Sequence, residues 1–207
     1  MLSDLILNVF FPPRCPVCQS RVEGADGVCP DCFARLRFIS NLSADRASAV
    51  VYDQVSRQMI LALKYGDRLD LAPLLARLMY NAGFFVLRDA DILTGVPSHW
   101  KRMMIRKYNQ AAVLAAELSK LSGIDVDPEI LKRVRATAKQ GSRAERFEHV
   151  QNAFVLNPKS NIRGKRIVLI DDVLTTGATT QACAGVLLKG GAKEVRILTF
   201  AKAAEND

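Results

Sequence analysis

The sequence predicts an α/β fold in which helices flank a parallel sheet, preceded by a small cysteine-rich module. Short apolar runs typical of strands alternate with helix-like apolar repeats through most of the chain, and this alternation indicates a parallel sheet. Four cysteines cluster between residues 15 and 32, in a stretch with too few large apolar residues for a core of its own. We therefore expect a cysteine-rich module over residues 1–45 and an α/β body over residues 46–207.

The composition is that of a globular protein rather than a disordered or fibrous chain. Of 207 residues, 49% are hydrophobic and 24% are charged, both close to the globular average. The formal net charge of +8 favours an anionic partner, which could be phosphate, nucleic acid or lipid headgroups. We expect no membrane span and a cytoplasmic location, because the best apolar run, Leu5 to Phe11, is short and lacks the features of a signal peptide.

The spacing of apolar residues predicts the elements of the body in order. Asp70 is the expected N-cap of the longest helix, because its carboxylate can accept hydrogen bonds from first-turn amides. Gly123 is expected to end a later helix, since glycine readily takes the left-handed conformation found after a helix end. The expected elements are a helix over 54–63, a helix over 71–86, a strand over 91–96, a helix over 111–121, a strand over 166–170 buried on both faces, a helix from 178 and a strand over 194–200.

Four of the five cysteines have the spacing of a zinc site. Cys15 and Cys18 form one C-x2-C pair, and Cys29 and Cys32 form a second pair after ten residues. Two such turns together make the four-sulfur cage that Zn2+ prefers. A redox pair and two incidental turns are the alternatives, but nothing nearby has a thioredoxin-like pattern. We expect structural zinc in a double zinc ribbon-like module, and a core position for Cys183.

Two adjacent carboxylates, Asp171 and Asp172, follow the strand over 166–170, and a turn rich in threonine comes next. Ligands of parallel sheets bind at this carboxyl end. The amides and hydroxyls of Thr175–Thr179 precede a helix, where free N–H groups and the helix dipole favour a phosphate. Neighbouring carboxylates favour a hydroxyl-rich or cationic ligand, such as a sugar diol with a divalent metal. An ordinary strand, turn and helix with threonine capping is the alternative.

The segment from Ile167 to Thr180 resembles the phosphoribosyl pyrophosphate (PRPP) signature of type I phosphoribosyltransferases. Nearly the whole chain is similar to the ComF family of competence-associated, phosphoribosyltransferase-like proteins. Lys107 and His149 stand where that family commonly has glycine and asparagine. The similar motifs are Phe11-Pro-Pro-Arg-Cys15 with the cysteine pairs, Leu63-Lys-Tyr-Gly-Asp67, Val96-Pro97, Arg102 through Arg106 to Tyr108-Asn-Gln110, and Arg133-Val-Arg135-Ala-Thr137 with Gln140, Arg146 and Ala153-Phe154.

This resemblance implies a type I phosphoribosyltransferase-like sheet that binds PRPP together with Mg2+. The two aspartates would hold the ribose hydroxyls, and the turn after them would hold the 5′-phosphate. Lys64-Tyr65-Gly66 would form the pyrophosphate loop, and the same residues fit a simple helix C-cap equally well. The implied PRPP-binding residues are Lys64, Tyr65, Gly66, Asp171, Asp172, Val173, Leu174, Thr175, Thr176, Gly177, Ala178 and Thr179.

Most of the excess positive charge lies between Lys101 and Arg146, a segment with eleven basic and five acidic residues. Polar residues interleave with these charges, which favours phosphate-facing loops over a plain solvated surface. Such loops would stabilise the charge that develops on a pyrophosphate leaving group. The implied pyrophosphate and acceptor loops carry Arg102, Tyr108, Asn109, Gln110, Arg133, Arg135 and Gln140, and the implied catalytic residues are Asp171, Asp172, Arg106 and Lys107.

Two functions fit this sequence. The first is transfer of phosphoribosyl from PRPP to an unidentified nitrogen nucleophile with release of pyrophosphate, linked to competence and DNA uptake. The second is a non-catalytic adapter that senses PRPP or a nucleotide, or binds single-stranded DNA, for DNA-uptake or recombination proteins. The acidic pair, the phosphate turn and the basic loops together favour the enzyme. No segment specifies a particular acceptor, because a fold of this kind serves many.

Overall fold

The protein is built on the predicted parallel sheet, as seen in a computed structural model that describes residues 14–22, 27–41, 43–65, 68–98, 108–134 and 153–204. The five strands of this sheet lie in the order β1-β7-β6-β2-β3, and each neighbouring pair is parallel. A separate antiparallel pair joins β4 and β5. The strands are β1 (Arg46–Val51), β2 (Ile92–Gly95), β3 (Asp125–Val126), β4 (Leu131–Arg133), β5 (Phe154–Leu156), β6 (Arg166–Leu174) and β7 (Glu194–Lys202).

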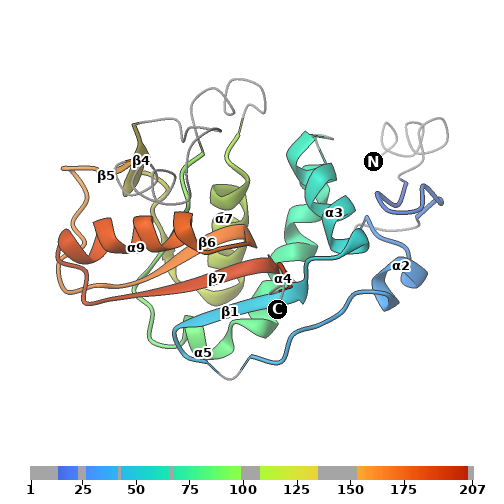
Figure 1. Cartoon of the computed structure of the whole chain (residues 1–207), viewed down its shortest axis with the longest axis horizontal. Helices are drawn as coiled ribbons and strands as arrows, with labels where there is room; N and C mark the ends of the chain where they lie inside the picture. Colours follow the sequence, from blue (N-terminus) through green and yellow to red (C-terminus); the bar gives the residue numbers. More distant parts are fainter. Residues whose placement is uncertain are drawn as a thin grey trace.

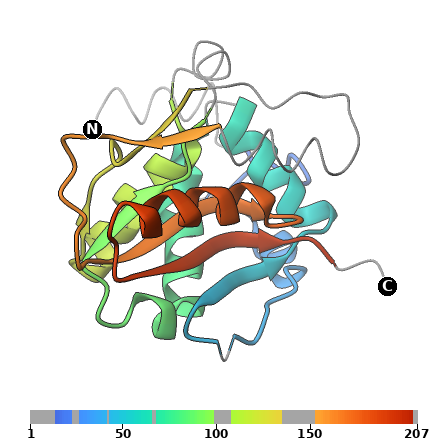
Figure 2. The ribbon, with the colours of Figure 1, turned by 60° about the vertical axis from the view of Figure 1, so that its left-hand side comes forward.

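Helices cover both faces of the sheet (Figures 1 and 2). Helices α3, α4 and α7 pack on one face, and α9 packs on the other, along β6 and β7. The short helix α2 belongs to the N-terminal segment and lies near α3, at the right of Figure 1 where the ribbon is blue. The helices are α2 (Pro30–Ala34), α3 (Gln54–Tyr65), the 3-10 turn η1 (Leu69–Leu71), α4 (Ala72–Ala82), α5 (Phe84–Leu87), α7 (Gln110–Ser122) and α9 (Ala178–Lys189).

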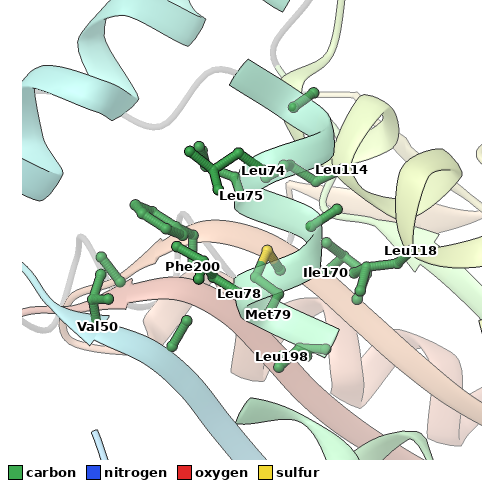
Figure 3. Packing of buried hydrophobic residues seen from close by; sticks show 14 of the residues in the cluster. Val50, Leu74, Leu75, Leu78, Met79, Leu114, Leu118, Ile170, Leu198 and Phe200 are labelled. Atoms are coloured by element: carbon green, nitrogen blue, oxygen red, sulfur yellow. The ribbon is translucent and has the colours of Figure 1, made fainter. Parts of the chain in front are cut away.

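The larger apolar core lies between the sheet and helices α4 and α7 (Figure 3). Met79 of α4 and Leu118 of α7 are fully buried there against Ile170 of β6. Alternate residues of β6 enter the second core beneath α9, where Leu169 packs with Cys183. β6 is therefore buried on both faces, as its continuous apolar run predicts. Cys183 takes the predicted core position.

The order of the strands reverses between β2 and β6. The chain leaves β2 through α7 toward β3 on one side, and it leaves β6 through α9 toward β7 on the other. Because the two connections diverge, a crevice is left outside the carboxyl ends of these neighbouring strands. The fold therefore marks the ends of β2 and β6 as the place where a ligand fits best.

The predicted helix after Asp70 differs from the observed one at both ends. The carboxylate of Asp70 receives the guanidinium of Arg68 instead of capping a helix, and α4 begins only after the 3-10 turn. Gly83 then separates α4 from α5, and a Cβ atom at this position would lie 2.8 Å from the Leu198 side chain. A charged neighbour thus overrides the cap signal of Asp70, and a glycine divides the apolar run into two helices.

Two of the described strands are longer than their apolar patterns suggest, and four others, β1, β3, β4 and β5, are absent from the expected elements. β6 continues through both aspartates to Leu174, and β7 continues to Lys202, because the two strands pair along this whole length. β1 pairs with β7, and the hydroxyl of its Ser48 meets that of Thr199 at 2.7 Å.

Within the described ranges, no helix combines the length and the apolar character needed to cross a bilayer.

Gly95, at the end of β2, allows α7 to approach the sheet closely. A Cβ atom there would lie 2.6 Å from backbone atoms of Ala111 and Ala112. Gly95→Ala should therefore lower the free energy of unfolding by about 1–3 kcal/mol, measured by urea denaturation. Gly185→Ala is the matched control, because that glycine of α9 has open space around its Cβ position and should tolerate alanine. Equal effects of the two changes would contradict the close approach.

Candidate functional site

A cavity of about 140 Å3 opens at the point where the strand order reverses. Its walls come from the end of α3, the segment after β2, the first turn of α7, β4, the end of β6 and the first turn of α9. It therefore joins the two faces of the sheet at one edge. Seven predicted site residues line it: Lys64, Asn109, Gln110, Arg133, Asp171, Asp172 and Thr179.

The two aspartates lie on opposite faces of β6, because successive side chains of a strand alternate. Asp171 is half-buried on the α9 face, and Asp172 is buried on the face that carries α3. The backbone amide of Asp172 donates a hydrogen bond of 2.9 Å to Oδ1 of Asp171. The carboxylates reach the cavity from both sides of the strand, so a ligand between them can contact each.

Lys64, in the last turn of α3, forms an ion pair with Asp172. Their side chains are 22% and 10% exposed, so the pair is largely shielded from water. The hydroxyl of Tyr108 donates a 2.8 Å hydrogen bond to the carbonyl of Leu63, one residue before the lysine. The end of α3 is thus held to the segment preceding α7, which fixes the point from which Lys64 reaches the acidic pair.

The acidic pair perturbs its own ionisation. Burial of the carboxyl and the negative charge of Asp172 raise the pKa of Asp171 to about 8, while the positive charge of Lys64 opposes this rise. Burial also raises the pKa of the Cys183 thiol, and the nearby Asp171 carboxyl raises it further. With its raised pKa, Asp171 holds a proton near neutral pH, and a cation or several hydroxyl donors bound beside it would favour its ionised form.

The first turn of α9 borders the cavity and begins without a side-chain cap. Its N-cap, Gly177, has a left-handed φ of 75° and no side chain to cap the helix. The exposed Thr176 accepts a weak 3.4 Å contact from the amide of Ala178, and Thr179 lines the cavity. A helix start of this kind suits an anion, because the unpaired amides and the dipole both favour negative charge.

The residues before α7 have structural partners of their own. The Asn109 side chain caps α7 by accepting from the amide of Ala111, and its amide group donates to the carbonyl of Val96. Ser98 donates to the same side chain at 3.1 Å. Gln110 is buried in the first turn of α7. The predicted Tyr-Asn-Gln loop therefore anchors the wall of the cavity as well as lining it.

A second cavity of about 340 Å3 adjoins the first through Pro97, Ser98, Asn109 and Arg133. Its other walls are mainly apolar and include Leu131. The guanidinium of Arg133 lies 5.3 Å from the centre of the Phe154 ring, which orients it at the boundary between the cavities.

The structure brings some predicted site residues to this edge and leaves others out of the cavity wall. Tyr65 is 64% exposed beside Lys64, and Thr175 is exposed on the turn after β6. Val173, Leu174, Gly177 and Ala178 form the end of β6 and the start of α9. Gly66, Arg102, Arg106, Lys107, Arg135 and Gln140 lie outside the described residues.

Sequence reasoning did not single out Ser98, which lines both cavities. Its position just after a parallel strand was the one available signal, because the ends of such strands converge at the ligand edge.

The four cysteines are arranged to hold a metal ion. Their sulfur atoms all lie within 4.8 Å of one another. In a tetrahedral four-sulfur zinc site, neighbouring sulfur atoms are about 3.8 Å apart. Cys29 caps α2 by accepting from the amide of Cys32. A hydrogen bond from the Ser20 hydroxyl lowers the pKa of Cys18 to about 6, which favours the thiolate that zinc needs. The residues present therefore fit structural zinc.

Comparisons with known proteins agree with both parts of the molecule. A double zinc ribbon domain model matches residues 6–50, and a phosphoribosyl transferase domain model matches residues 109–206. Competence protein F of Haemophilus influenzae is 32% identical over 157 residues, which cover 70% of this chain and 67% of that protein. The chain belongs to the ComF family.

Other similar proteins extend this ComF assignment over most of the chain. DNA utilization protein YhgH of Salmonella typhimurium is 29% identical over 201 residues, which cover 88% of this chain and 87% of that protein. Among solved structures, a hypoxanthine phosphoribosyltransferase of Staphylococcus aureus matches 66% of this chain and 76% of its own, at 13% identity and a TM-score of 0.43. The 32% identical relative confirms the predicted family, and the phosphoribosyl transferase domain model and the parallel sheet confirm the predicted type I phosphoribosyltransferase-like fold.

Asp171→Asn should change how the stability of this ComF protein depends on pH. The carboxyl ionises near pH 4 when unfolded but near pH 8 when folded, so the folded state binds the proton more tightly in between. Wild-type stability should therefore fall as the pH rises through this window, and the asparagine variant should escape that loss.

We expect the variant to gain about 0.5–2 kcal/mol over the wild type at the upper end of this window, measured by urea denaturation at both ends. Asp125→Asn, which changes an exposed carboxylate at the start of β3, is the control and should follow the wild type. Parallel pH profiles for Asp171→Asn and wild type would refute the expectation.

The cysteine cluster should bind one equivalent of zinc. Cys32→Ser should abolish stoichiometric zinc in the purified chain, because the serine hydroxyl is a poor substitute for a thiolate ligand. Cys183→Ala removes an equally buried cysteine from the other core and should retain the metal. Metal analysis by mass spectrometry checks both, and zinc retained by Cys32→Ser would exclude the cluster as its site.

Proposed function

We propose that this ComF protein binds PRPP and transfers its phosphoribosyl group to a nitrogen nucleophile. The observation that carries the proposal is the single cavity that joins an acidic pair, a lysine and the start of α9. These three features complement a sugar diol, a pyrophosphate and a 5′-phosphate, which together make up PRPP. The match of a phosphoribosyl transferase domain model supports the same ligand.

Each part of the ligand has a proposed partner. Asp171 and Asp172 accept hydrogen bonds from the ribose hydroxyls, and the amides and hydroxyls from Thr175 to Thr179 bind the 5′-phosphate. Lys64 pairs with Asp172 before binding and can turn to the pyrophosphate once the ribose occupies the carboxylates. Arg133 stands between the two cavities, where it can meet the leaving group.

The proposed reaction needs no covalent enzyme intermediate. The bond between the anomeric carbon and the pyrophosphate oxygen breaks, and its electron pair leaves with pyrophosphate. The lone pair of the acceptor nitrogen forms the new bond to carbon, and the nitrogen loses its proton to solvent. Asp171 and Asp172 stabilise the positive charge that develops on the ribose ring, and cationic side chains stabilise the leaving group. The larger adjoining cavity offers room for the acceptor.

The carboxylates also suit the Mg2+ that would accompany PRPP, because carboxylate oxygens are ligands that this ion prefers. The pKa of Asp171 is raised by burial and by the charge of Asp172, and a cation that arrives with the substrate would lower this pKa again and keep both carboxylates ionised. When bound, Mg2+ would supply positive charge to the leaving pyrophosphate.

The wider setting of the protein is part of the same proposal. We place the boundary between the zinc module and the phosphoribosyltransferase-like body at residues 45 and 46, where β1 begins. We propose a cytoplasmic location and a role with DNA-uptake or recombination proteins. The names of the relatives, competence protein F and DNA utilization protein, support a task connected with DNA.

Calorimetry with PRPP and Mg2+ tests the ligand. The wild type should bind, and Asp172→Asn should weaken binding by about tenfold or more, because a buried carboxylate with charged partners contributes more than a neutral hydrogen bond. Asp125→Asn is the matched control at an exposed position and should bind like the wild type. Equal binding by Asp172→Asn would remove the acidic pair from the site.

Release of pyrophosphate tests the chemistry, with bases, ammonia and other amines offered as acceptors. Release that depends on one acceptor would support the transferase. PRPP binding without any release would favour the second candidate, a non-catalytic adapter that senses PRPP or a nucleotide. Binding of single-stranded DNA that weakens steeply with salt would favour a DNA-binding adapter through phosphate contacts.

A further inference from the structure

The side chain of Arg68 ties the cysteine cluster to the body. Its guanidinium donates to both carboxylate oxygens of Asp70 at 2.8 Å, and it also donates to the carbonyl of Arg14 at 2.7 Å. Arg14 immediately precedes Cys15, a member of the cluster. The planar guanidinium suits this arrangement, because it can hold a carboxylate with two donors while a third donor points elsewhere.

The contact is reinforced by close packing between the module and the turn η1. Gly27, which precedes Cys29 by two residues, has a left-handed φ of 64°. A Cβ atom on Gly27 would lie 2.8 Å from the side chain of Leu71 and 3.0 Å from that of Asp70. Val17 and Val28 contact both the cysteine cluster and the main core. The module therefore rests directly on the segment that follows α3.

The helix that precedes this segment, α3, carries the lysine of the candidate site. Lys64 lies four residues before Arg68, at the end of α3, and pairs with Asp172. The backbone amide of Arg68 donates back to the carbonyl of Ala62 in α3 at 3.5 Å. Arg68 thus contacts the module with its side chain and the last turn of α3 with its backbone. Arg68 therefore offers a direct path between the module and the last turn of α3.

We propose that Arg68 couples the cysteine cluster to the binding site, so that zinc and PRPP strengthen each other's binding. Zinc fixes the position of Arg14, Arg14 and Asp70 fix the guanidinium of Arg68, and Arg68 fixes the end of α3 from which Lys64 acts. Arg68 is a positioning residue, since it acts through Lys64. This inference rests on the proposed PRPP function, and it gives the metal a role beyond folding the module.

The coupling must be reciprocal, because two ligands that share one binding equilibrium alter each other's affinity by the same factor. PRPP should therefore tighten zinc as much as zinc tightens PRPP. A purely structural module would not behave in this way, because its metal would stabilise the cysteine turns without responding to a ligand at the sheet edge. Reciprocity is thus the property that separates the proposal from a simple structural site.

Hydrogen exchange measures the coupling without any activity assay. Removal of zinc from the full chain should speed exchange in peptides covering residues 54–65 and 68–82, which contain α3, η1 and α4. Peptides covering α9, on the opposite face of the sheet, should keep their protection. Unchanged exchange in 54–65, or an equal loss in α9, would overturn the proposal.

Arg68→Ala should reproduce the effect of zinc removal on residues 54–65 while the metal stays bound. Arg88→Ala is the matched control, because this arginine is 70% exposed and within the described residues its side chain makes one long contact, 3.8 Å from Asp89. Arg68→Lys should give an intermediate result, since one ammonium group cannot hold Asp70 with two donors and also reach Arg14. Wild-type exchange in Arg68→Ala would overturn the proposal.

Zinc affinity, measured by competition with a zinc-selective chelator, should rise about fivefold or more when PRPP and Mg2+ are added to the wild type. The increase should persist in Arg88→Ala and disappear in Arg68→Ala. Failure of the wild type to bind PRPP at all would refute the proposed function, and the exchange experiment would still judge the mechanical link. PRPP binding with no change in zinc affinity would overturn the coupling alone.

Discussion

Strand β6 is the constraint on which the other parts of the molecule depend. It is the one strand of the described sheet that is buried beneath both helical layers and also carries two consecutive carboxylates. Burying negative charge at the end of an apolar strand is costly unless partners are supplied. The ion pair from α3 and the hydrogen bond from the strand's own backbone supply part of that compensation. Neighbouring elements on the sheet are therefore placed so that the carboxylates at the end of β6 have partners.

The sequence alone predicted those features that are decided by residues close together in the chain. The apolar run before Asp171 predicted a doubly buried strand, and Gly123 predicted a helix end that indeed has a left-handed φ of 72°. The spacing of the cysteines predicted a cluster whose sulfur atoms converge. In each case the residues that decide the structure lie within a few positions of one another, so the pattern alone carries the information.

Other features depend on residues far apart and could not be predicted in this way. Asp70 is of a residue type that commonly caps helices, yet its carboxylate binds the guanidinium of Arg68 instead. The same guanidinium also donates to a carbonyl 54 positions earlier in the chain. β1 contains Ser48 and looks weak as a strand, but pairing with β7 and a hydroxyl contact across 151 positions stabilise it. Reading Arg68 or Ser98 as important requires the folded chain, because neither belongs to a local motif.

The alternation of Asp171 and Asp172 across β6 has a mechanical consequence. One carboxylate belongs to the layer of α9, and the other belongs to the layer of α3, α4 and α7. A small molecule held by both therefore connects the two layers through the edge of a single strand. The energy of binding is shared between the two layers, so an occupied site makes the protein stiffer as a whole.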